Sequence, residues 1–175
     1  DEAGTALTTG DNNVAIGFEA LTTEDADGSN TAVGYRALKT LNAGAEGLNT
    51  AVGKDAGTAV TTGVKSTLIG ALSGDALSGG GENVAVGYNS LGADTNGSRS
   101  VAIGWDSLQA QNFATATNAY NVAVGANAAA AVTTGTQNTI IGGLAGDALT
   151  TGSNSVAIGY LALSTEDTDS GNVAV

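Results

Sequence analysis

The sequence predicts an all-β protein, a parallel β-solenoid of about ten coils with 17 residues in each. Three observations predict this fold. A phrase such as NNVAIGFEAL (residues 12–21) recurs along the chain, its spacing is nearly constant, and β-branched residues alternate within it. A repeat of this kind indicates stacked units, because each unit buries its apolar face only against its neighbours. Repetition therefore replaces the one or two ordinary domains that the length alone would suggest.

The period is set by the glycine that ends each phrase. Successive glycines lie 17 residues apart, with 19 between Gly34 and Gly53 and 21 between Gly104 and Gly125. The nine positions are Gly17, Gly34, Gly53, Gly70, Gly87, Gly104, Gly125, Gly142 and Gly159. We therefore expect residues 1–175 to form a single repeat domain with two local insertions. Since the chain has no Met and opens on Asp1, we also expect it to be a fragment of a longer fibrous protein.

The residues before each glycine are predicted to form a short strand. Ile or Val directly precedes every one of these glycines, and Val or Thr stands two residues earlier, so both side chains point to one face. We expect this aliphatic pair to form the core and to stack over the pair of the next coil. The core residues predicted are Val14, Ile16, Val33, Val52, Ile69, Val86, Ile103, Val124, Ile141 and Ile158.

The opposite face of each strand is small. Ala separates the two aliphatic residues, except where Leu68 or Ile140 stands there. Such a face would let the backbones of neighbouring chains approach closely. A single coil buries only a few aliphatic side chains, and this scarcely offsets the conformational entropy of ordering 17 residues. We therefore expect a homo-oligomer whose axis runs parallel to the rod.

The remainder of each coil predicts a weaker second strand, such as 20–23 or 6–9, followed by a polar, Gly-rich turn. Asn or Ser stands just before every first strand and favours a turn. A helix is disfavoured because β-branched residues and Gly recur in each period. A β-helix of hexapeptides is also disfavoured, because counting six and twelve residues on from Ile16 gives Thr22 and Gly28 instead of aliphatic residues.

Composition excludes several functions. The 17 acidic residues outnumber the 5 basic ones, which leaves a net charge of -12 and argues against nucleic acid or a bare membrane surface as a partner. No apolar run is long enough to span a bilayer, so direct membrane insertion is not expected. The absence of Cys and His removes the usual nucleophile, base and transition-metal ligands, and leaves only Lys39, Lys54 and Lys65 as alternative bases. We therefore expect neither an enzyme nor a bound cofactor.

The repeated phrases NVAVG, SVAIG and NTAVGYRAL resemble the head repeats of trimeric autotransporter adhesins of the YadA-like type. They are also similar to repeats of bacteriophage tail-fibre proteins. The resemblance covers about residues 5–175 and implies a left-handed β-roll in a homotrimer that attaches to a host receptor, extracellular matrix or surface glycan. It also implies a place outside the cell, at a bacterial surface or on a virion tail. The 17-residue period is longer than that of the adhesin heads, so both carriers remain open.

An aromatic residue follows the glycine in five coils, with Leu three residues later. These residues are Phe18, Tyr35, Tyr88, Trp105 and Tyr160. They predict aromatic bands along the rod, separated by coils with small residues. One interpretation is that the rings stack on one another and cover the edge of the coil. The other is that they are platforms for sugar rings, with Tyr35 and Trp105 as the candidates.

The two insertions are the other candidates for receptor binding, because solenoids place such extensions on one surface. They span residues 39–48 and 109–120, and the second contains Phe113 and Tyr120. This loop is predicted either to fold back as a lid or to be offered to a partner.

Two further features favour weaker hypotheses. Acidic turns containing Asp25, Asp27, Asp167 and Asp169 have carboxylates spaced as in calcium loops, but neither completes the twelve-residue pattern, so solvated turns without metal are expected. Paired threonines such as 61–62 and 150–151 suggest ice binding as an alternative function, because β-solenoids with rows of Thr can order water. Aromatic coils interrupt these pairs, so no continuous array of them is expected.

Overall fold

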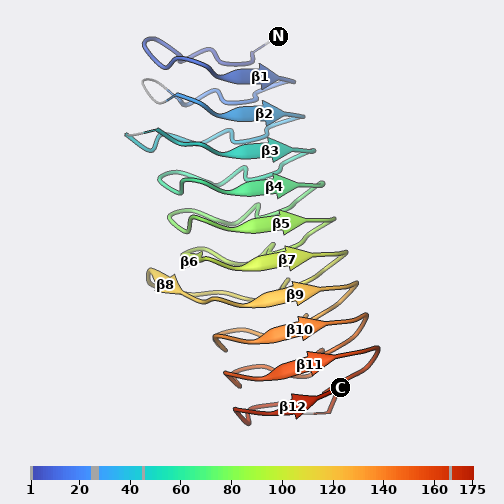
Figure 1. Cartoon of the computed structure of the whole chain (residues 1–175). Coiled ribbons are helices and arrows are strands. Elements are labelled where there is room, and N and C mark those ends of the chain that lie inside the picture. Colours follow the sequence, from blue (N-terminus) through green and yellow to red (C-terminus); the bar gives the residue numbers. More distant parts are fainter. Residues whose placement is uncertain (1, 25–27, 45, 166) are drawn as a thin grey trace.

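A computed structural model describes residues 2–24, 28–44, 46–165 and 167–175, and these residues are all-β with no helix. Their coils stack into a rod with the two chain ends at opposite ends (Figure 1). Ten strands form one parallel sheet along it, in the order β1-β2-β3-β4-β5-β7-β9-β10-β11-β12. Seen from the N-terminal end, the chain recedes while turning counterclockwise, so the winding is left-handed (Figure 1). The predicted fold class, a parallel β-solenoid with a 17-residue coil, is confirmed.

The strands are short and lie at the positions that the repeat predicts. The strands of the main sheet are β1 (Val14–Ile16), β2 (Thr31–Val33), β3 (Thr50–Val52), β4 (Thr67–Ile69), β5 (Val84–Val86), β7 (Val101–Ile103), β9 (Val122–Val124), β10 (Thr139–Ile141), β11 (Val156–Ile158) and β12 (Val173–Ala174). Two further strands, β6 (Gly97–Ser98) and β8 (Thr117–Asn118), pair in a second parallel sheet.

Equivalent residues of successive coils stack directly over one another. Val84 of β5 is paired with Val101 of β7, and Val86 is paired with Ile103. The two insertions do not disturb this register, because Ile103 is in turn paired with Val124 across the longer of them. The prediction that the aliphatic pairs form vertical columns is confirmed.

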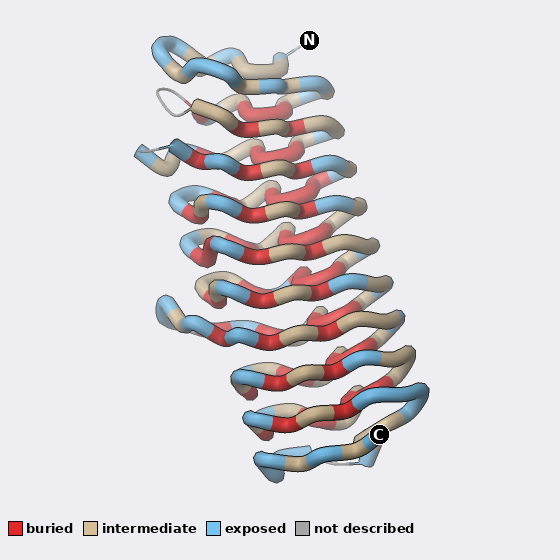
Figure 2. The backbone as a smooth tube through the Cα atoms, viewed as in Figure 1, coloured by how far each residue is buried: buried red, intermediate tan, exposed pale blue. Residues whose placement is uncertain are grey.

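The prediction that these columns form the interior of the coil is wrong. The middle residue of each strand points inward: Ala32, Leu68, Ala102 and Ile140, for example, are fully buried. The aliphatic pair points away from the coil and is exposed or half-buried. The outward-facing residues include Val14, Ile16, Val33, Val52, Ile69, Val86, Ile103, Val124, Ile141 and Ile158. Figure 2 shows the buried residues recurring at the same place in coil after coil.

The physical reason for this inversion is the thinness of the coil. After each corner glycine the chain passes back beneath the strand, on its small-residue side, and where the fourth residue of the returning chain is Leu, its side chain fills the space there. Leu91, for example, is fully buried in the coil whose strand carries Ala85. Where the strand itself supplies a large residue, the returning chain is reduced to Gly: Leu68 is followed by Gly74. A Cβ at Gly74 would lie 2.9 Å from Leu68 Cδ2, so the two positions share one volume.

The seven residues after each corner glycine, here called the return segment, do not form the predicted second strand. They form turns in which the φ angle is positive at the second and fourth residues, as at Glu19 (φ 53) and Leu21 (φ 52). The Ala20 N–H donates to the Gly17 carbonyl (3.3 Å), which closes a turn, and the Leu21 N–H donates to Ala37 of the next coil (3.0 Å). Hydrogen bonds therefore still run from coil to coil, although the local backbone is not extended.

The Asn or Ser before each strand forms a buried ladder instead of an exposed turn. The side-chain oxygen of Asn83 accepts a hydrogen bond from the Ser100 N–H (2.9 Å), and its Nδ2 donates to the Gly97 carbonyl (2.9 Å). Asn138 does the same with Ser155 (2.9 Å) and Gly152 (2.9 Å). Buried backbone N–H and C=O groups must be paired, and this ladder pairs those at the corner, which the strand hydrogen bonds do not reach. The left-handed residue is the one before it, as at Glu82 (φ 59).

The corner glycines are required by both conformation and space. Gly104 has a φ of 135°, which side-chain-bearing residues rarely adopt, and a Cβ there would overlap the carbonyl of Gly125 in the next coil. The same overlap recurs between the other successive corners up to Gly142 and Gly159. This close approach of backbones explains why Gly recurs at the corner of every repeat.

Candidate functional site

The outward side of the ten-stranded sheet, here called the outer face, is an exposed and mostly apolar strip that runs along the rod. It consists of two parallel rows, one of Val or Thr and one of Ile or Val, that continue through successive coils. Ile16 is 59% exposed, and Ile69, Ile103 and Ile158 are each close to 40% exposed. Ten strands about 4.8 Å apart and a width of two side chains give a strip on the order of 300 Å². A strip of that size is comparable with the largest apolar patch of a typical monomer, and such patches are often functional.

The aromatic residues line the edge where the strands end. Phe18 and Tyr35 lie in adjacent coils with ring centroids 5.7 Å apart and planes inclined by 12°, so they are stacked. The Arg36 guanidinium carbon lies 5.7 Å from the Tyr35 ring centroid. Trp105 is 54% exposed, and Tyr88 and Tyr160 are also exposed. The stacking interpretation is therefore confirmed for the first band, while Trp105 keeps the exposure that a sugar platform needs.

An ion-pair ladder runs beside this first aromatic band. Lys39 Nζ lies 2.6 Å from Glu19 Oε2, and Arg36 Nε lies 3.5 Å from Asp55 Oδ1. Burial, with a smaller contribution from Asp55, raises the pKa of Asp75 in the next coil above its usual range, although hydrogen bonds from backbone N–H groups oppose the shift. The Lys39–Glu19 and Arg36–Asp55 ion pairs connect adjacent coils and locally balance part of the excess negative charge.

The second insertion places its two aromatic side chains in opposite environments. Phe113 is only 7% exposed and packs into the rod, whereas Tyr120 is 47% exposed. The Thr95 hydroxyl donates to the Phe113 carbonyl (2.9 Å), and β8 of the insertion pairs with β6. Of the two roles predicted for this loop, folding back applies to Phe113 and display applies to Tyr120.

A buried polar network holds the insertion against the rod. Asp94 and Gln111 are fully buried at positions that carry Leu77 in the preceding coil and Val132 in the following one. Gln111 Nε2 donates to Asp94 Oδ2 (2.6 Å), and Asp94 Oδ1 accepts from the Phe113 N–H (3.3 Å). A buried carboxylate requires such partners, since leaving it unpaired would be costly. The network therefore fixes where the loop departs and how Phe113 enters the interior.

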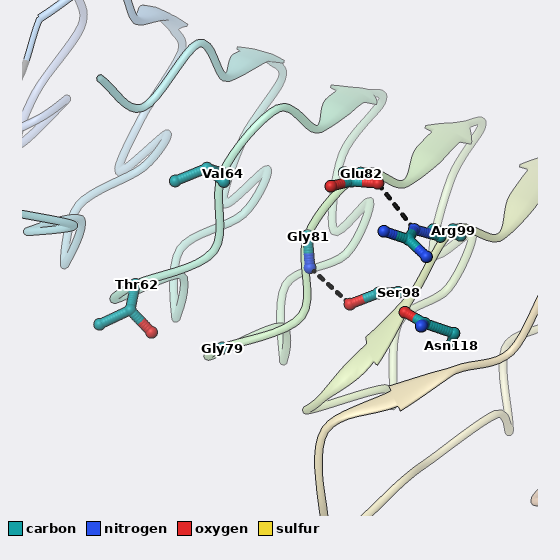
Figure 3. A pocket seen from close by; sticks show the side chains of 8 residues that line it. All are labelled: Thr62, Val64, Gly79, Gly81, Glu82, Ser98, Arg99 and Asn118. Carbon is teal, nitrogen blue, oxygen red and sulfur yellow. Dashed lines mark hydrogen bonds and ion pairs between the residues drawn. The ribbon is translucent and has the colours of Figure 1, made fainter. Parts of the chain in front are cut away.

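The edge opposite the aromatic band carries a pocket of about 180 Å³ next to this insertion. Its floor includes Gly79 and Gly81, and six side chains surround it, those of Thr62, Val64, Glu82, Ser98, Arg99 and Asn118 (Figure 3). Thr62, Gly79 and Asn96 occupy the same position in successive coils, as do Val64, Gly81 and Ser98. The pocket therefore exists because one coil lacks the two side chains that its neighbours carry. Asn118 of β8 borders it from the insertion.

A column of charged and aromatic residues borders the pocket. Lys65, Glu82, Arg99 and Tyr120 occupy the left-handed position of four successive coils, with φ between 52° and 63°. Arg99 Nε lies 2.8 Å from Glu82 Oε2 (Figure 3), and its Nη1 donates to the Tyr120 hydroxyl (2.7 Å). The hydrogen bond and charge of Arg99, with a smaller effect of Lys65, lower the pKa of Glu82. The pKa of Arg99 is raised by the same bond to Glu82 and by the bond to Tyr120.

The two acidic turns are only partly described by the structure. Asp25 and Asp27 lie outside the described residues. Asp167 and Asp169 are described and exposed, and the Asp167 carboxylate accepts a hydrogen bond from the Thr150 hydroxyl. No group of three or more acidic side chains gathers around a possible ion anywhere in residues 2–24, 28–44, 46–165 and 167–175. Those same ranges contain no helix long and apolar enough to cross a membrane.

Comparison of the chain with protein-family models, with curated proteins and with solved structures finds no match in any of the three. The features of the molecule that bear on its function are therefore the outer face, the exposed aromatic residues and the pocket.

The sequence predicts Tyr120 and Trp105 as exposed candidates but does not predict the pocket. The structure does not bring Tyr35 and Trp105 together with Tyr120, because they follow the corner glycines whereas Tyr120 precedes a strand. The pocket could have been predicted from the run Gly79–Gly80–Gly81. The residues 17 positions before and after Gly79 and Gly81 all carry side chains larger than glycine's.

Proposed function

We propose that this chain is a non-enzymatic segment of an extracellular fibre that assembles with copies of itself and attaches to a receptor. The single observation that carries the proposal is the outer face, an apolar strip that extends along the sheet and that the chain itself leaves uncovered. A second copy is the natural occupant, because it offers the same flat, apolar strip with the same coil spacing. The resemblance of the repeats to adhesin heads supports three copies.

The likeness of the repeats also supports the setting. It favours the head of a trimeric adhesin on a bacterial surface, with a bacteriophage tail fibre as the alternative carrier. In either case the exposed aromatic edge and the edge that carries the pocket are the places where a host receptor, matrix protein or surface glycan would bind. The absence of His and Cys from the sequence supports binding without catalysis.

Sedimentation equilibrium tests the assembly directly. We expect the wild-type chain to have three times its monomer mass, and Ile103→Lys, in the middle of the outer face, to shift it to the monomer because a buried charge would be unpaired. Thr134→Lys adds the same charge at an exposed turn and should leave the mass unchanged. Since each copy carries a charge of -12, added salt should strengthen association. A compact monomer at high salt and high concentration would contradict the proposal.

Ice binding is a second candidate, and one observation favours it. The paired threonines are interrupted, but the outer face is continuous and includes Thr31, Thr50 and Thr67 in three successive strands of a parallel sheet. Regular rows of β-branched side chains at the strand spacing can order water. Thermal hysteresis measured on the purified chain separates the two functions: strong hysteresis from a monomer supports ice binding, and its absence from an oligomer supports the fibre.

A further inference from the structure

The pocket beside the second insertion has no role in the packing of the rod. It is produced by Gly79 and Gly81, whose equivalents one coil away are Thr62 and Val64 on one side and Asn96 and Ser98 on the other. A Cβ at Gly79 would meet only side-chain atoms, Asn96 Oδ1 at 3.1 Å and Thr62 Oγ1 at 3.6 Å, so the Asn96 amide must shift slightly to admit it. A Cβ at Gly81 would instead lie 2.7 Å from the Val64 carbonyl oxygen. The backbone therefore requires Gly at position 81 but not at position 79, and a side chain at position 79 would fill the pocket.

The groups that face the pocket are neutral in sum and rich in hydrogen-bonding capacity. Glu82 and Arg99 neutralise each other through their 2.8 Å contact (Figure 3). Arg99 uses Nε for Glu82 Oε2 and Nη1 for Tyr120. Glu82 Oε1 and Arg99 Nη2 have no hydrogen-bond partner among the described residues. The Ser98 hydroxyl accepts from the Gly81 N–H (3.1 Å), so its own proton is available to a ligand.

The remaining walls complete a mixed lining. Thr62 contributes a hydroxyl, Asn118 an amide and Val64 an apolar side chain. Donors and acceptors placed around an apolar patch match a ring that carries hydroxyl groups on its edge and C–H groups on its faces. An anion would be repelled by Glu82 and by the net charge of -12, and a cation would face Arg99.

We propose that this pocket binds one neutral sugar ring, as the terminal or branch residue of a surface glycan. Its volume of about 180 Å³ is below the range of about 300–1,000 Å³ typical of sites for larger ligands, which limits it to a single ring. The position of the pocket at the edge of the rod, next to the exposed Tyr120, leaves room for the rest of the glycan outside. This inference rests on the proposed receptor-binding role and names the class of its ligand.

Saturation-transfer NMR on the full chain tests the proposal, with glucose, galactose, mannose and N-acetylglucosamine as neutral probes. N-acetylneuraminic acid and inorganic phosphate are the anionic probes. We expect at least one neutral sugar to bind with a dissociation constant on the order of 1–10 mM, as is usual for so small a ligand. Gly79→Thr, which restores the side chain found one coil earlier, should abolish the signal. Arg99→Gln should weaken binding at least about fivefold, which corresponds to the loss of one charge-assisted hydrogen bond.

Gly143→Thr is the matched control, because it adds the same side chain at a glycine whose nearest neighbour would be 3.7 Å away in Tyr160. It should bind like the wild type. No saturation transfer to any neutral sugar, equal signals from Gly79→Thr and wild type, or stronger binding of the anions would overturn the inference. Sedimentation of the same samples separates the two proposals: an oligomer that binds no sugar overturns only the pocket, and a monomer that binds sugar overturns only the assembly.

Discussion

At the scale of single residues, the interior is governed by a trade of volume between the strand and the return segment. Leu68 points inward from β4 and Gly74 opens space for it, whereas Ala85 of the next coil is accompanied by Leu91. The thin coil can hold one large side chain at this level, and two would overlap. Where neither residue is large, as at Ala51 and Gly57, Leu38 and Leu68 of the adjacent coils fill the space.

A double-mutant cycle at Leu68 and Gly74 measures this trade. Leu68→Ala should cost about 2–5 kcal/mol of unfolding free energy, because it opens a cavity. Gly74→Leu should also destabilise, because its Cβ would approach Leu68 and Leu77 to within 3 Å. The double variant reproduces the arrangement of the next coil, so we expect it to recover at least about half of the summed loss.

Urea unfolding of the wild type, the two single variants and the double variant gives these free energies, and costs that simply add would contradict the shared volume.

The same residues show how much of the fold could be predicted from the sequence. Alternation along the strand predicts two faces and their columns, but the usual rule that aliphatic residues lie inside predicts the wrong one. The pairing of Leu68 with Gly74, and of Ile140 with Gly146, is the signal that identifies the inner face.

At the scale of elements, the second insertion is a loop anchored from within. Its bounds follow from the repeat, because an extra four residues separate Gly104 from Gly125. Its conformation does not, since the anchor is a polar network between Asp94 and Gln111 at positions where most other coils have aliphatic residues. A propensity argument treats such residues as exposed, and only the stacked coils show that they face each other.

The anchor predicts how the loop responds when Phe113 is removed. Phe113→Ala deletes a nearly fully buried ring, so the loop should open locally without unfolding the rod. Amide hydrogen exchange should accelerate at least tenfold at Thr117 and Ala119, which donate to Asn96 and Ser98. The amides of β7 and β9 should remain protected. Phe18→Ala removes an exposed ring and serves as the control, and uniform acceleration along the chain would contradict a local anchor.

At the scale of the whole molecule, the rod is a linear stack in which each coil contacts the one before and the one after it. This part of the structure follows from the sequence, because a period of 17 residues with alternating β-branched positions leaves few other folds. The exposed state of the outer face does not follow, since it depends on which side the return segment covers. An apolar strip along the rod means that the stability of one chain is linked to the presence of others.

Thermal unfolding at several protein concentrations checks that link. If copies cover the outer face, the midpoint should rise by about 2–4 °C for each tenfold increase in concentration, as mass action requires for a chain of this length. Ile103→Lys should lose this dependence and unfold at the lower midpoint of the isolated chain, whereas Thr134→Lys should retain it. A midpoint of the wild type that is independent of concentration would mean that nothing but solvent covers the strip.

The recess at Gly79 and Gly81 arises where one coil lacks the side chains that its neighbours carry at the same two positions. Its two glycines are not equivalent: a side chain at position 79 would erase the site without rebuilding a loop, whereas a Cβ at position 81 would lie 2.7 Å from the Val64 carbonyl oxygen. The stacked backbone that forms the recess is thus distinct from most of the side chains that line it, so single substitutions of those side chains can change which ligand binds without changing the fold.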